Sequence, residues 1–440
     1  MAWDHVKIIG KALAFYFPLL VRLAIQRVAA LLHRRTWRDT ANFKNVVVVG
    51  GSFAGMELVK RLSETLPTGF KVVWIEKNSH LNYTFTFPRF SVMTGHEHMS
   101  FIPYDGVAKS APNGIFKRIQ DTAVGLTKNQ VLLASGDKID YAYVAIATGS
   151  SQPLPVQVLA TERSDACHEL QGVQETIKAS QNIAIIGGGA VGVELASDIK
   201  DFYPGKDVTL VHSRGEILSH FGKRLQDYAL EALQDELKIR VLLNERPKMP
   251  AGGIMARSAS LTFSDGHEEK FDLIIGCTGQ QPNSSFLRSL LPDAISKETS
   301  RILVQPTLQV ATADEPNLDA PIFAFGDVAD HNGPRMARAG WMQAGVVLDN
   351  ILSMIGGQAP WRIYQPDEFI EGAIKLTLGK THSVIYSIDG NGSDVLVPSK
   401  NGSLDLDIKR AWKMYGANPK FIEEACSADT YPGSIRDAHG

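Results

Sequence analysis

Two glycine-rich segments, each placed directly after a short apolar run, constrain the fold of this chain more than any other feature. Residues 45–49 run into the sequence GGSFAG at 50–55, and residues 182–186 run into GGGAVG at 187–192. A strand that turns sharply through glycines into a helix leaves free amide groups at the helix start, where a pyrophosphate binds. The sequence therefore predicts an α/β protein with two dinucleotide sites.

The residue that follows the next strand differs between the two copies. Strand 71–75 ends in Glu76, and a carboxylate at this place typically accepts a hydrogen bond from a ribose hydroxyl. Strand 207–211 ends in His212-Ser213-Arg214, which offers no carboxylate and can accommodate a 2′-phosphate. We therefore expect the second site to accept NADPH as well as NADH. The alternative is that Arg214 is a solvated surface charge and that NADH binds without it.

The first turn departs from the usual glycine pattern at its middle position. Ser52 stands there, and its Cβ is expected to crowd the place where a pyrophosphate approaches the backbone. The same residues resemble the G-x-S-x-G turn of serine hydrolases. That interpretation lacks the last glycine, because Ala54 occupies its place, and it leaves the second glycine turn unexplained.

Charge and cysteine content exclude several other classes of protein. The 440 residues include 45 Lys and Arg against 47 Asp and Glu, so we expect no broad positive field and no nucleic-acid partner. The three cysteines, Cys167, Cys277 and Cys426, form no C-x-x-C spacing. We therefore predict neither a redox disulfide nor a metal site.

Three further segments complete a recognisable order of motifs. An apolar strand runs into Ala147-Thr148-Gly149, another into Cys277-Thr278-Gly279, and a third ends in Gly326-Asp327 before a helix-like stretch at 336–351. With these motifs the chain resembles the two-dinucleotide-binding-domain flavoproteins, the pyridine nucleotide-disulfide oxidoreductase superfamily. Within it, the nearest likeness is to apoptosis-inducing-factor-like proteins, including the ferroptosis-suppressor branch, and to type II NAD(P)H:quinone dehydrogenases.

This resemblance implies two Rossmann-like domains, one for FAD and one for NAD(P), and a smaller α+β C-terminal domain. The expected FAD domain comprises residues 45–150 and 280–355, with the NAD(P) domain inserted at 151–279. Residues 356–440 form the expected C-terminal domain, and residues 1–44 precede the fold.

The resemblance also implies roles for individual residues. The FAD site is expected to use Gly50, Ser52, Ala54, Gly55, Glu76, Arg89, Thr148, Gly149, Gly326 and Asp327. The site for NADPH or NADH is expected to use Gly187, Gly189, Gly192, His212, Arg214 and Gly279. Glu194 is expected near the nicotinamide and the flavin, opposite a lysine for which Lys400 is the candidate, so these two form the predicted catalytic pair.

The expected acceptor is a quinone or another small molecule. The disulfide-reductase relatives carry a cysteine pair beside the flavin, whereas residues 83–95 contain no cysteine. Phe85, Phe87, Pro88 and Phe90 are candidates to line an apolar approach, although core aromatics are an equal alternative. A tailoring oxidase acting on a specific metabolite and a signalling flavoprotein without catalytic function are the rival hypotheses.

The first forty residues are both basic and apolar. Seven basic residues face only Asp4 and Asp39, and the longest uncharged run, 12–21, contains Pro18. A clean membrane-spanning helix is therefore not expected, and the pattern favours an interfacial helix at a membrane surface. A mitochondrial presequence is the second hypothesis, and a helix packed on the protein's own body is the third. The expected location is intracellular and peripheral to a membrane.

Overall fold

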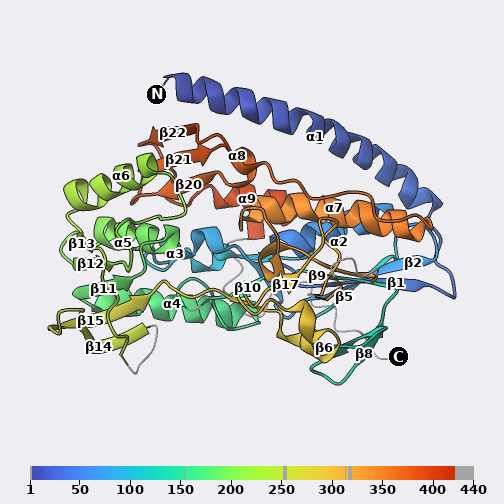
Figure 1. Ribbon diagram of the computed structural model, residues 1–440, viewed down its shortest axis with the longest axis horizontal. Helices are drawn as coiled ribbons and strands as arrows, with labels where there is room; N and C mark the ends of the chain where they lie inside the picture. Colours follow the sequence, from blue (N-terminus) through green and yellow to red (C-terminus); the bar gives the residue numbers. More distant parts are fainter. Residues whose placement is uncertain (1, 153, 251–254, 313, 316–319, 422–440) are drawn as a thin grey trace.

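Two parallel sheets lie side by side in the body of the protein (Figure 1). The computed structural model describes residues 2–152, 154–250, 255–312, 314–315 and 320–421. The first sheet has the strand order β18-β9-β1-β2-β5, and all its neighbours are parallel. Its strands are β18 (Ile322–Ala324), β9 (Tyr143–Ile146), β1 (Lys44–Val49), β2 (Phe70–Ile75) and β5 (Phe116–Ile119).

The second sheet contains the other glycine turn and has the order β13-β12-β11-β15-β14. Only the β14 edge is antiparallel. Its strands are β13 (Arg240–Leu242), β12 (Asp207–Val211), β11 (Asn182–Ile186), β15 (Glu268–Gly276) and β14 (Met255–Thr262). Both central strands, β1 and β11, are rich in β-branched residues and buried at their carboxyl ends, as parallel strands covered on both faces require.

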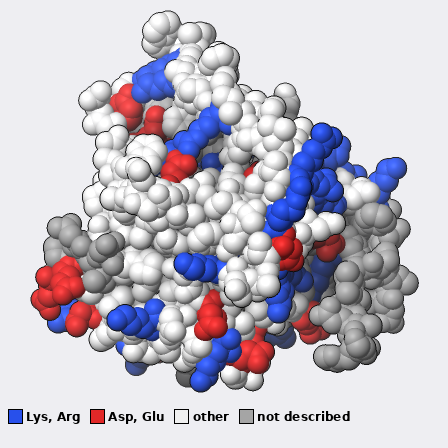
Figure 2. Space-filling model, turned by 90° about the vertical axis from the view of Figure 1, so that its right-hand side faces the viewer, with Lys and Arg blue, Asp and Glu red and all other residues white. Residues whose placement is uncertain are grey.

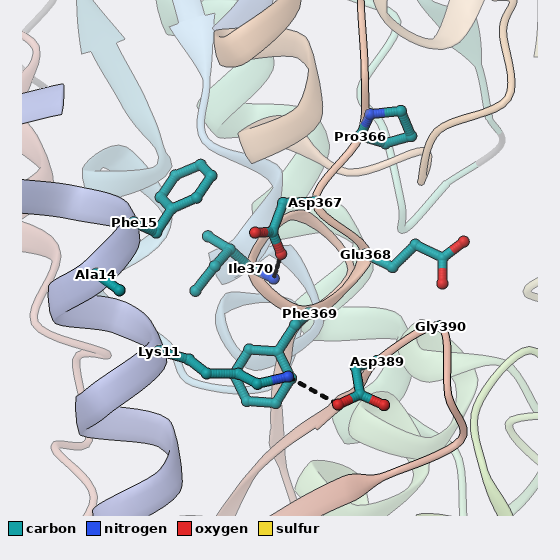
Figure 3. Close-up of a pocket in the computed structure, with 10 residues that line it drawn as sticks. All are labelled: Lys11, Ala14, Phe15, Pro366, Asp367, Glu368, Phe369, Ile370, Asp389 and Gly390. Carbon is teal, nitrogen blue, oxygen red and sulfur yellow. Dashed lines mark hydrogen bonds and ion pairs between the residues drawn. The ribbon is translucent and has the colours of Figure 1, made fainter. Parts of the chain in front are cut away.

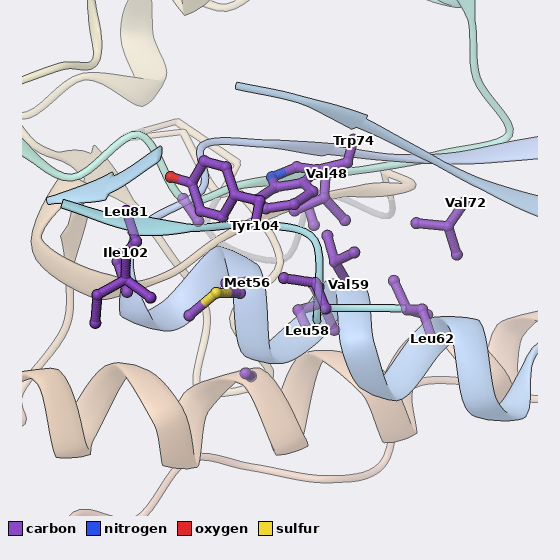
Figure 4. Packing of buried hydrophobic residues seen from close by; sticks show 14 of the residues in the cluster. Val48, Met56, Leu58, Val59, Leu62, Val72, Trp74, Leu81, Ile102 and Tyr104 are labelled. Carbon is purple, nitrogen blue, oxygen red and sulfur yellow. The ribbon is translucent and has the colours of Figure 1, made fainter. Parts of the chain in front are cut away.

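Helices cover the faces of these sheets and enclose two main cores. Three helices lie next to the first sheet: α2 (Phe53–Thr65), α3 (Phe87–Phe90) and α7 (Ala337–Ile355). Three others lie next to the second sheet: α4 (Arg163–Ala179), α5 (Ala190–Phe202) and α6 (Lys223–Glu231). A π-helical turn (Ala232–Glu236) extends α6. Figure 4 shows apolar side chains of α2, such as Leu58, Val59 and Leu62, packing against Val48, Val72 and Trp74 of the sheet. This core fixes α2 directly behind the first glycine turn.

Short strands and turns connect the two sheets. Two-stranded pairs form between β3 (His80–Asn82) and β4 (Phe101–Pro103), β10 (Ser150–Ser151) and β16 (Gln281–Pro282), and β17 (Ile302–Leu303) and β19 (Ala329–Asp330). A three-stranded sheet comprises β6 (Ala123–Leu126), β7 (Gln130–Leu133) and β8 (Lys138–Asp140). Single 3-10 turns occupy Thr84–Thr86, Glu97–Ser100, Ser285–Ser289, Pro292–Ala294, Gly326–Val328 and Pro419–Phe421. The β10–β16 pair is where the chain passes between the two Rossmann-like units.

A small antiparallel sheet, β20-β21-β22, completes the fold as the sequence analysis expected. Its elements are α8 (Glu368–Glu371), β20 (Ile374–Thr377), β21 (Ser383–Ile388), β22 (Asp394–Ser399) and α9 (Ile408–Met414). Leu376, Leu378 and Val384 pack into the same core as α5, so this unit leans on the second Rossmann-like unit. The overall class is therefore α/β with two dinucleotide folds and a small C-terminal unit.

Helix α1 (Ala2–Thr36) lies along the outside of all three units (Figure 1). Pro18 lies inside this helix, which continues through it. Polar side chains of α1 face the body of the protein. Three ion pairs join them to it: Asp4 with Arg224 at 2.8 Å, Lys11 with Asp389 at 2.7 Å (Figure 3), and Arg22 with Asp349 at 2.5 Å. Gln26 also donates a hydrogen bond to Glu64 at 3.2 Å. Ile8 and Phe15 add apolar contacts to α8 and β22.

The opposite side of α1 is apolar and turned outward. Apolar residues that share one side of the helix are 56–69% exposed: Val6, Ile9, Leu13, Phe17, Leu20, Val28 and Leu31. This is the reverse of an ordinary surface helix, which buries its apolar stripe. The hypothesis of a helix packed on the body is thus correct for the polar side only, and the apolar side has no covering among the described residues.

By length and composition, α1 is sufficient to cross a membrane. The qualifying stretch is Trp3–Thr36, and none of its most apolar window is buried. The sequence analysis did not expect a clean span, because the uncharged run 12–21 is short and contains Pro18. The structure adds that the helix is continuous and long enough, and it does not decide whether α1 crosses a membrane. A signal sequence near the N-terminus would meet the same criteria.

Acidic and basic side chains alternate on the face near the carboxyl end of α1. Figure 2 shows Lys and Arg interspersed with Asp and Glu over this face, with broad uncharged areas between them. The pattern agrees with the near-neutral formal charge of −2.

Candidate functional site

The first glycine turn joins β1 to α2 in the geometry of a dinucleotide cradle. Gly50 has a φ of +104°, and a Cβ there would lie 2.3 Å from the carbonyl oxygen of Ala147. A Cβ on Gly55 would lie 2.1 Å from the carbonyl oxygen of Gly50, so the glycine allows α2 to approach the strand. The amide groups at the start of α2 are therefore presented to the space beyond the sheet edge.

Ser52, the residue that departs from the glycine pattern, is accommodated without strain. It is the N-cap of α2, with φ −79° and ψ −166°, and it is exposed. Because its φ is negative, a side chain is tolerated here, which a positive-φ position would not allow. The expected crowding therefore does not disturb the backbone of the turn.

Glu76 lies directly after the end of β2 and packs against the first turn, since a Cβ on Gly51 would lie 2.7 Å from its side chain. One of its carboxylate oxygens accepts a hydrogen bond from the backbone N–H of Asn78 at 2.8 Å, and burial raises its pKa. Two aromatic residues, which the sequence analysis did not single out, hold the turn from behind. Trp74 donates to the carbonyl of Gly50 at 3.1 Å, and Tyr104 donates to that of Gly51 at 2.9 Å.

The third side of the cradle is formed where the chain crosses between the two units. Thr148 donates through its hydroxyl to the carbonyl of Asn283 at 2.7 Å, and the Asn283 side chain returns a hydrogen bond to the Thr148 carbonyl at 2.9 Å. Gly149 has a φ of +63°. These reciprocal bonds fasten the two crossing segments to each other beside the first cradle.

Gly326 and Asp327 follow β18 and lie beside the start of α7. The amide of Gly326 donates to the side chain of Gln343 at 2.7 Å. Burial raises the pKa of Asp327, and nearby Arg301 and Arg335 counteract this shift. Ala54 lies against this corner, since a Cβ on Gly340 would be 2.9 Å from its side chain. The first turn, Asp327 and the start of α7 therefore surround one space.

The second turn repeats this geometry between β11 and α5. Gly187 has a φ of +122°, and a Cβ on Gly192 would lie 1.9 Å from the carbonyl oxygen of Gly187. By contrast, a Cβ on Gly189 would meet nothing within 4 Å, so its lack of a side chain leaves open space. Gly279, at the neighbouring strand end, is similarly open and has a φ of +87°.

His212 and Arg214 lie beside the second turn, where the sequence predicted them. Nδ1 of His212 accepts a hydrogen bond from the amide of Gly188 at 3.1 Å, which leaves the proton of the neutral ring on Nε2. Burial lowers the pKa of His212, and its Nε2 has no hydrogen-bond partner among the residues that the structure describes. Arg214 is exposed and bonds to the hydroxyl of Ser219. His212 therefore packs against the turn at Gly188, and Arg214 is a cation on the surface two residues further along the chain.

Glu194 lies on α5 beneath the small C-terminal sheet. Its carboxylate accepts hydrogen bonds from the backbone N–H and the hydroxyl of Thr377, at 3.0 and 3.1 Å. Burial raises the pKa of Glu194 to about 7, and the neighbouring Asp198 adds to the effect. The sequence analysis expected Lys400 opposite this acid. Lys400 is exposed at the end of β22, and no contact joins it to Glu194 in the described part of the chain.

Arg89 is not placed as the sequence analysis expected. It is only 1% exposed and pairs with Asp198 at 2.7 Å. Its other donors bind the carbonyl oxygens of Gly379, Lys380 and Leu404. Because these bonds occupy its guanidinium, Arg89 ties α3 to α5 and to the C-terminal unit instead of facing a cofactor.

Comparison with known proteins shows to which family this chain belongs. The family model described as pyridine nucleotide-disulphide oxidoreductase matches residues 44–344. The chain belongs to this family. Membership implies FAD and NAD(P)H as cofactors and an FAD-dependent oxidoreductase activity. The two cradles fit that pair: in each, the first glycine has a positive φ and the last glycine allows the helix to approach the strand, and open space remains at Gly189 and Gly279 of the second.

Individual proteins are similar to this chain over most of its length. Fe-regulated protein 8 of Mycosarcoma maydis is 31% identical over 400 residues, covering 85% of this chain and 95% of that protein. Ferroptosis suppressor protein 1 of Mus musculus is 29% identical over 385 residues, covering 85% of this chain and 96% of that protein. The sulfide:quinone oxidoreductase of Aquifex aeolicus has a similar fold, with a TM-score of 0.65 at 17% identity over 87% of this chain and 92% of that one.

No redox disulfide of the kind that gives the family its name is found in the described residues. Cys167 and Cys277 form no disulfide within the described part of the chain, and Cys426 lies outside it. Burial raises the pKa of Cys277 to about 12, so it remains a thiol at neutral pH. The cysteine-free stretch after the first cradle forms part of the fold around α3.

The aromatic residues of that stretch divide into two groups. Phe87, Pro88 and Phe90 are buried in the main core, so the core alternative is correct for them. Phe85 is half-exposed and lies 5.1 Å from the ring of Phe53, which follows Ser52 at the start of α2. Tyr83 and Tyr415 complete an aromatic patch with these two, at centroid distances of 5.3–6.2 Å.

Proposed function

We propose that this protein oxidises NAD(P)H through FAD and passes the electrons to a quinone-like acceptor at a membrane surface. The observation that carries the proposal is the pair of complete dinucleotide cradles, joined by the crossing at Thr148 and Asn283, with no disulfide between them in the described residues. FAD, when bound, supplies the chemistry of accepting a hydride and releasing two electrons. The chain supplies binding, orientation and exclusion of water.

In this proposal the first cradle holds FAD. The amides at the start of α2, freed by Gly50 and Gly55, bind the pyrophosphate, while Glu76 accepts a hydrogen bond from the adenosine ribose. Asp327 binds the ribityl chain, and the start of α7 directs free amides at the pyrimidine edge of the ring. A helix start stabilises the negative charge that a reduced flavin carries there.

The second cradle holds the nicotinamide dinucleotide. Gly187 and Gly192 set the turn, and Gly189 leaves space for the pyrophosphate. His212 offers its Nε2 proton to the adenosine ribose or its phosphate. Glu194, held by Thr377, would orient the nicotinamide.

Two features support a membrane-borne acceptor. The aromatic patch of Phe53, Tyr83, Phe85 and Tyr415 offers ring faces next to the first cradle, where a flat acceptor can stack. The outward stripe of α1 presents apolar side chains to a bilayer, and exposed Arg27, Arg34 and Arg35 suit anionic headgroups. The Aquifex aeolicus protein with a similar fold is a sulfide:quinone oxidoreductase, which supports a quinone as the acceptor on this fold.

The direct test is anaerobic reduction of the purified, yellow protein. We expect NADPH or NADH to bleach the flavin absorption, and an added ubiquinone analogue to restore it faster than oxygen does. Reoxidation by oxygen alone would favour an oxidase that acts on a specific metabolite. A flavin that stays yellow with both nucleotides would favour a signalling role and would contradict the proposal.

A second expected result concerns the choice between nucleotides. Arg214→Ala should raise the KM for NADPH roughly tenfold to hundredfold while changing that for NADH less than about twofold, because a charge-assisted hydrogen bond to a phosphate contributes about 1.5–3 kcal/mol. Steady-state kinetics with both nucleotides measure this, and Lys270→Ala, which removes an exposed cation of the same unit, is the control. Equal changes for both nucleotides would show that Arg214 is only a surface charge.

A further inference from the structure

One face of α5 is bonded to the loop between β20 and β21 of the C-terminal unit. Three side chains of this face, Glu194, Ser197 and Asp201, accept hydrogen bonds at 2.6–3.1 Å from backbone N–H groups of residues 377–380. A fourth side chain of the same face, Asp198, is fully buried. The part of α5 that bears Glu194 is therefore held in one arrangement against the C-terminal unit.

Asp198 is the member of this face that does not bond to the loop directly. Its Oδ1 pairs with Nε of Arg89 at 2.7 Å, and the other donors of Arg89 bind carbonyl oxygens of the C-terminal unit. Its Oδ2 is buried and has no hydrogen-bond partner among the residues that the structure describes. Burial raises the pKa of Asp198 to about 6, and Arg89 opposes this shift. An asparagine would accept the same bond without burying a charge, so the acid calls for an explanation.

Glu194 lies one helical turn before Asp198, and one of its two oxygens is available to a ligand. Oε1 accepts both bonds from Thr377, whereas Oε2 receives none from the described residues, and the side chain is partly exposed. Residues four apart on a helix are neighbours, and like charges there repel each other. Burial raises the pKa of Glu194 to about 7, the bonds from Thr377 oppose this shift, and the charge of Asp198 adds to it. Glu194 therefore gains or loses its charge near neutral pH.

Few charged groups lie on the elements packed around Glu194. They are Asp198, Lys200 and Asp201 on α5, Arg89 on α3, and Lys375 and Lys380 of the C-terminal unit. Lys375 is exposed, and the ammonium of Lys380 lies over an aromatic ring of α5 at 4.9 Å from its centroid. Asp198 and Arg89 are the two that act on Glu194 directly, Asp198 raising its pKa and Arg89 lowering it.

We propose that Asp198, held in place by Arg89, is a positioning residue that acts through Glu194 on nucleotide binding. Its negative charge makes Glu194 take up a proton as the pH falls through neutrality. Above neutrality Oε2 accepts a hydrogen bond from the nicotinamide carboxamide, and below neutrality this bond is lost. The second cradle therefore binds its nucleotide less tightly in acidic solution. This inference rests on the proposed function, which assigns the nicotinamide to Glu194.

The test compares the binding of NAD⁺ with that of ADP-ribose, which has the same adenosine and diphosphate but no nicotinamide. NAD⁺ leaves the flavin oxidised, so calorimetry measures its Kd on the full-length holoprotein without turnover. From about pH 8 to about pH 6 we expect the Kd for NAD⁺ to rise up to about tenfold, because the ionised fraction of Glu194 falls by about this factor. The Kd for ADP-ribose should change less than about twofold.

Two variants should move the midpoint of this pH dependence in opposite directions. Asp198→Asn keeps the acceptor for Arg89 and removes the negative charge, so the midpoint should fall by about one pH unit. NAD⁺ should then bind roughly fivefold more tightly than to wild type at about pH 6. Thr377→Val keeps the backbone bond and removes the hydroxyl bond to Glu194, so the midpoint should rise. Asp235→Asn, which removes an exposed acid of the same unit, is the matched control and should leave the midpoint unchanged.

A purely structural role would give a different pattern. If Asp198→Asn weakened NAD⁺ and ADP-ribose equally and left the midpoint in place, the pair with Arg89 would only brace the fold. Should Asp198→Asn not fold, Thr377→Val still decides, since a midpoint that does not rise contradicts the inference. A wild-type Kd for NAD⁺ that is constant from about pH 8 to about pH 6, or that falls toward acid, would show that Glu194 does not bind the nicotinamide in its ionised form. Absence of NAD⁺ binding at every pH is a distinct result, because it removes the second cradle and with it the proposed function.

Discussion

Replacing Gly189 with valine should weaken binding of NAD(P)H about a hundredfold or more and leave the fold and the bound flavin intact. A Cβ at this position meets no protein atom within 4 Å, and the φ of −77° is open to any residue. The open space lies at the N-cap of α5, where the amides receive the pyrophosphate. Two lost charge-assisted hydrogen bonds at about 1.5 kcal/mol each correspond to a factor of more than a hundred.

Gly172→Val is the matched control for this prediction. Gly172 is exposed within α4 and is likewise surrounded by open space, so valine there should change stability only by the small helix-propensity difference, which favours valine over glycine. Flavin content, Tm and the dissociation constant for NADPH measured by stopped-flow separate the two variants. Unchanged NADPH affinity in Gly189→Val would mean that the second cradle does not bind the dinucleotide as proposed. Gly192 is unsuitable for this test, because its Cβ would clash with the backbone at 1.9 Å and disturb the fold.

Placing two glutamates on the outward side of α1 should abolish binding to anionic vesicles. Leu13 and Phe17 are 64% and 69% exposed and lie one turn apart on that side. Burying two such side chains in a bilayer contributes roughly 3–6 kcal/mol, and Leu13→Glu with Phe17→Glu removes this while adding repulsion from anionic lipid. We expect the fraction that sediments with phosphatidylserine-containing vesicles to fall at least about tenfold, with NADPH-dependent bleaching retained.

The control places the same charges on exposed apolar residues elsewhere. Val124→Glu with Leu159→Glu changes two side chains that are 54% and 74% exposed on other parts of the surface, so net charge is matched. Equal loss in both double variants would attribute binding to overall charge. Undiminished sedimentation of the α1 variant would contradict the membrane role. Release of the wild-type protein by high salt alone would favour the basic residues over the apolar stripe as the main contact.

The sequence predicted the two cradles closely because each is a local structure. Residues 50–55 form one turn and residues 187–192 form the other. In each turn the first glycine has a positive φ and the last glycine, five residues later, packs closely against the first, so all the residues that shape the turn lie within it. The order of the apolar runs predicts that strands and helices alternate. The family pattern predicts that strand 322–324 returns to the first sheet. For this reason the fold class and the place of Glu76 and His212 needed no tertiary information.

The partners of buried charges could not be predicted in the same way. Arg89 belongs to a stretch next to the first cradle, yet it pairs with Asp198, 109 residues away. Glu194 is bound by Thr377, 183 residues away, while Lys400 stays exposed. No local pattern marks such pairs, because each is decided by which elements pack together after the second unit and the C-terminal unit have closed on each other.

The amino-acid order alone therefore determined what is set by short-range sterics: two strand–glycine–helix turns, their acid or base at the next strand end, and an N-terminal helix that is basic and apolar. Only the tertiary structure decided which side of that helix faces the body, and which buried partners hold Arg89 and Glu194. The physical reason is that burial and the distance between charges depend on all three units at once. A helix can satisfy its charged residues against distant acids and leave its apolar stripe outside, and nothing in its own periodicity shows which side will turn inward.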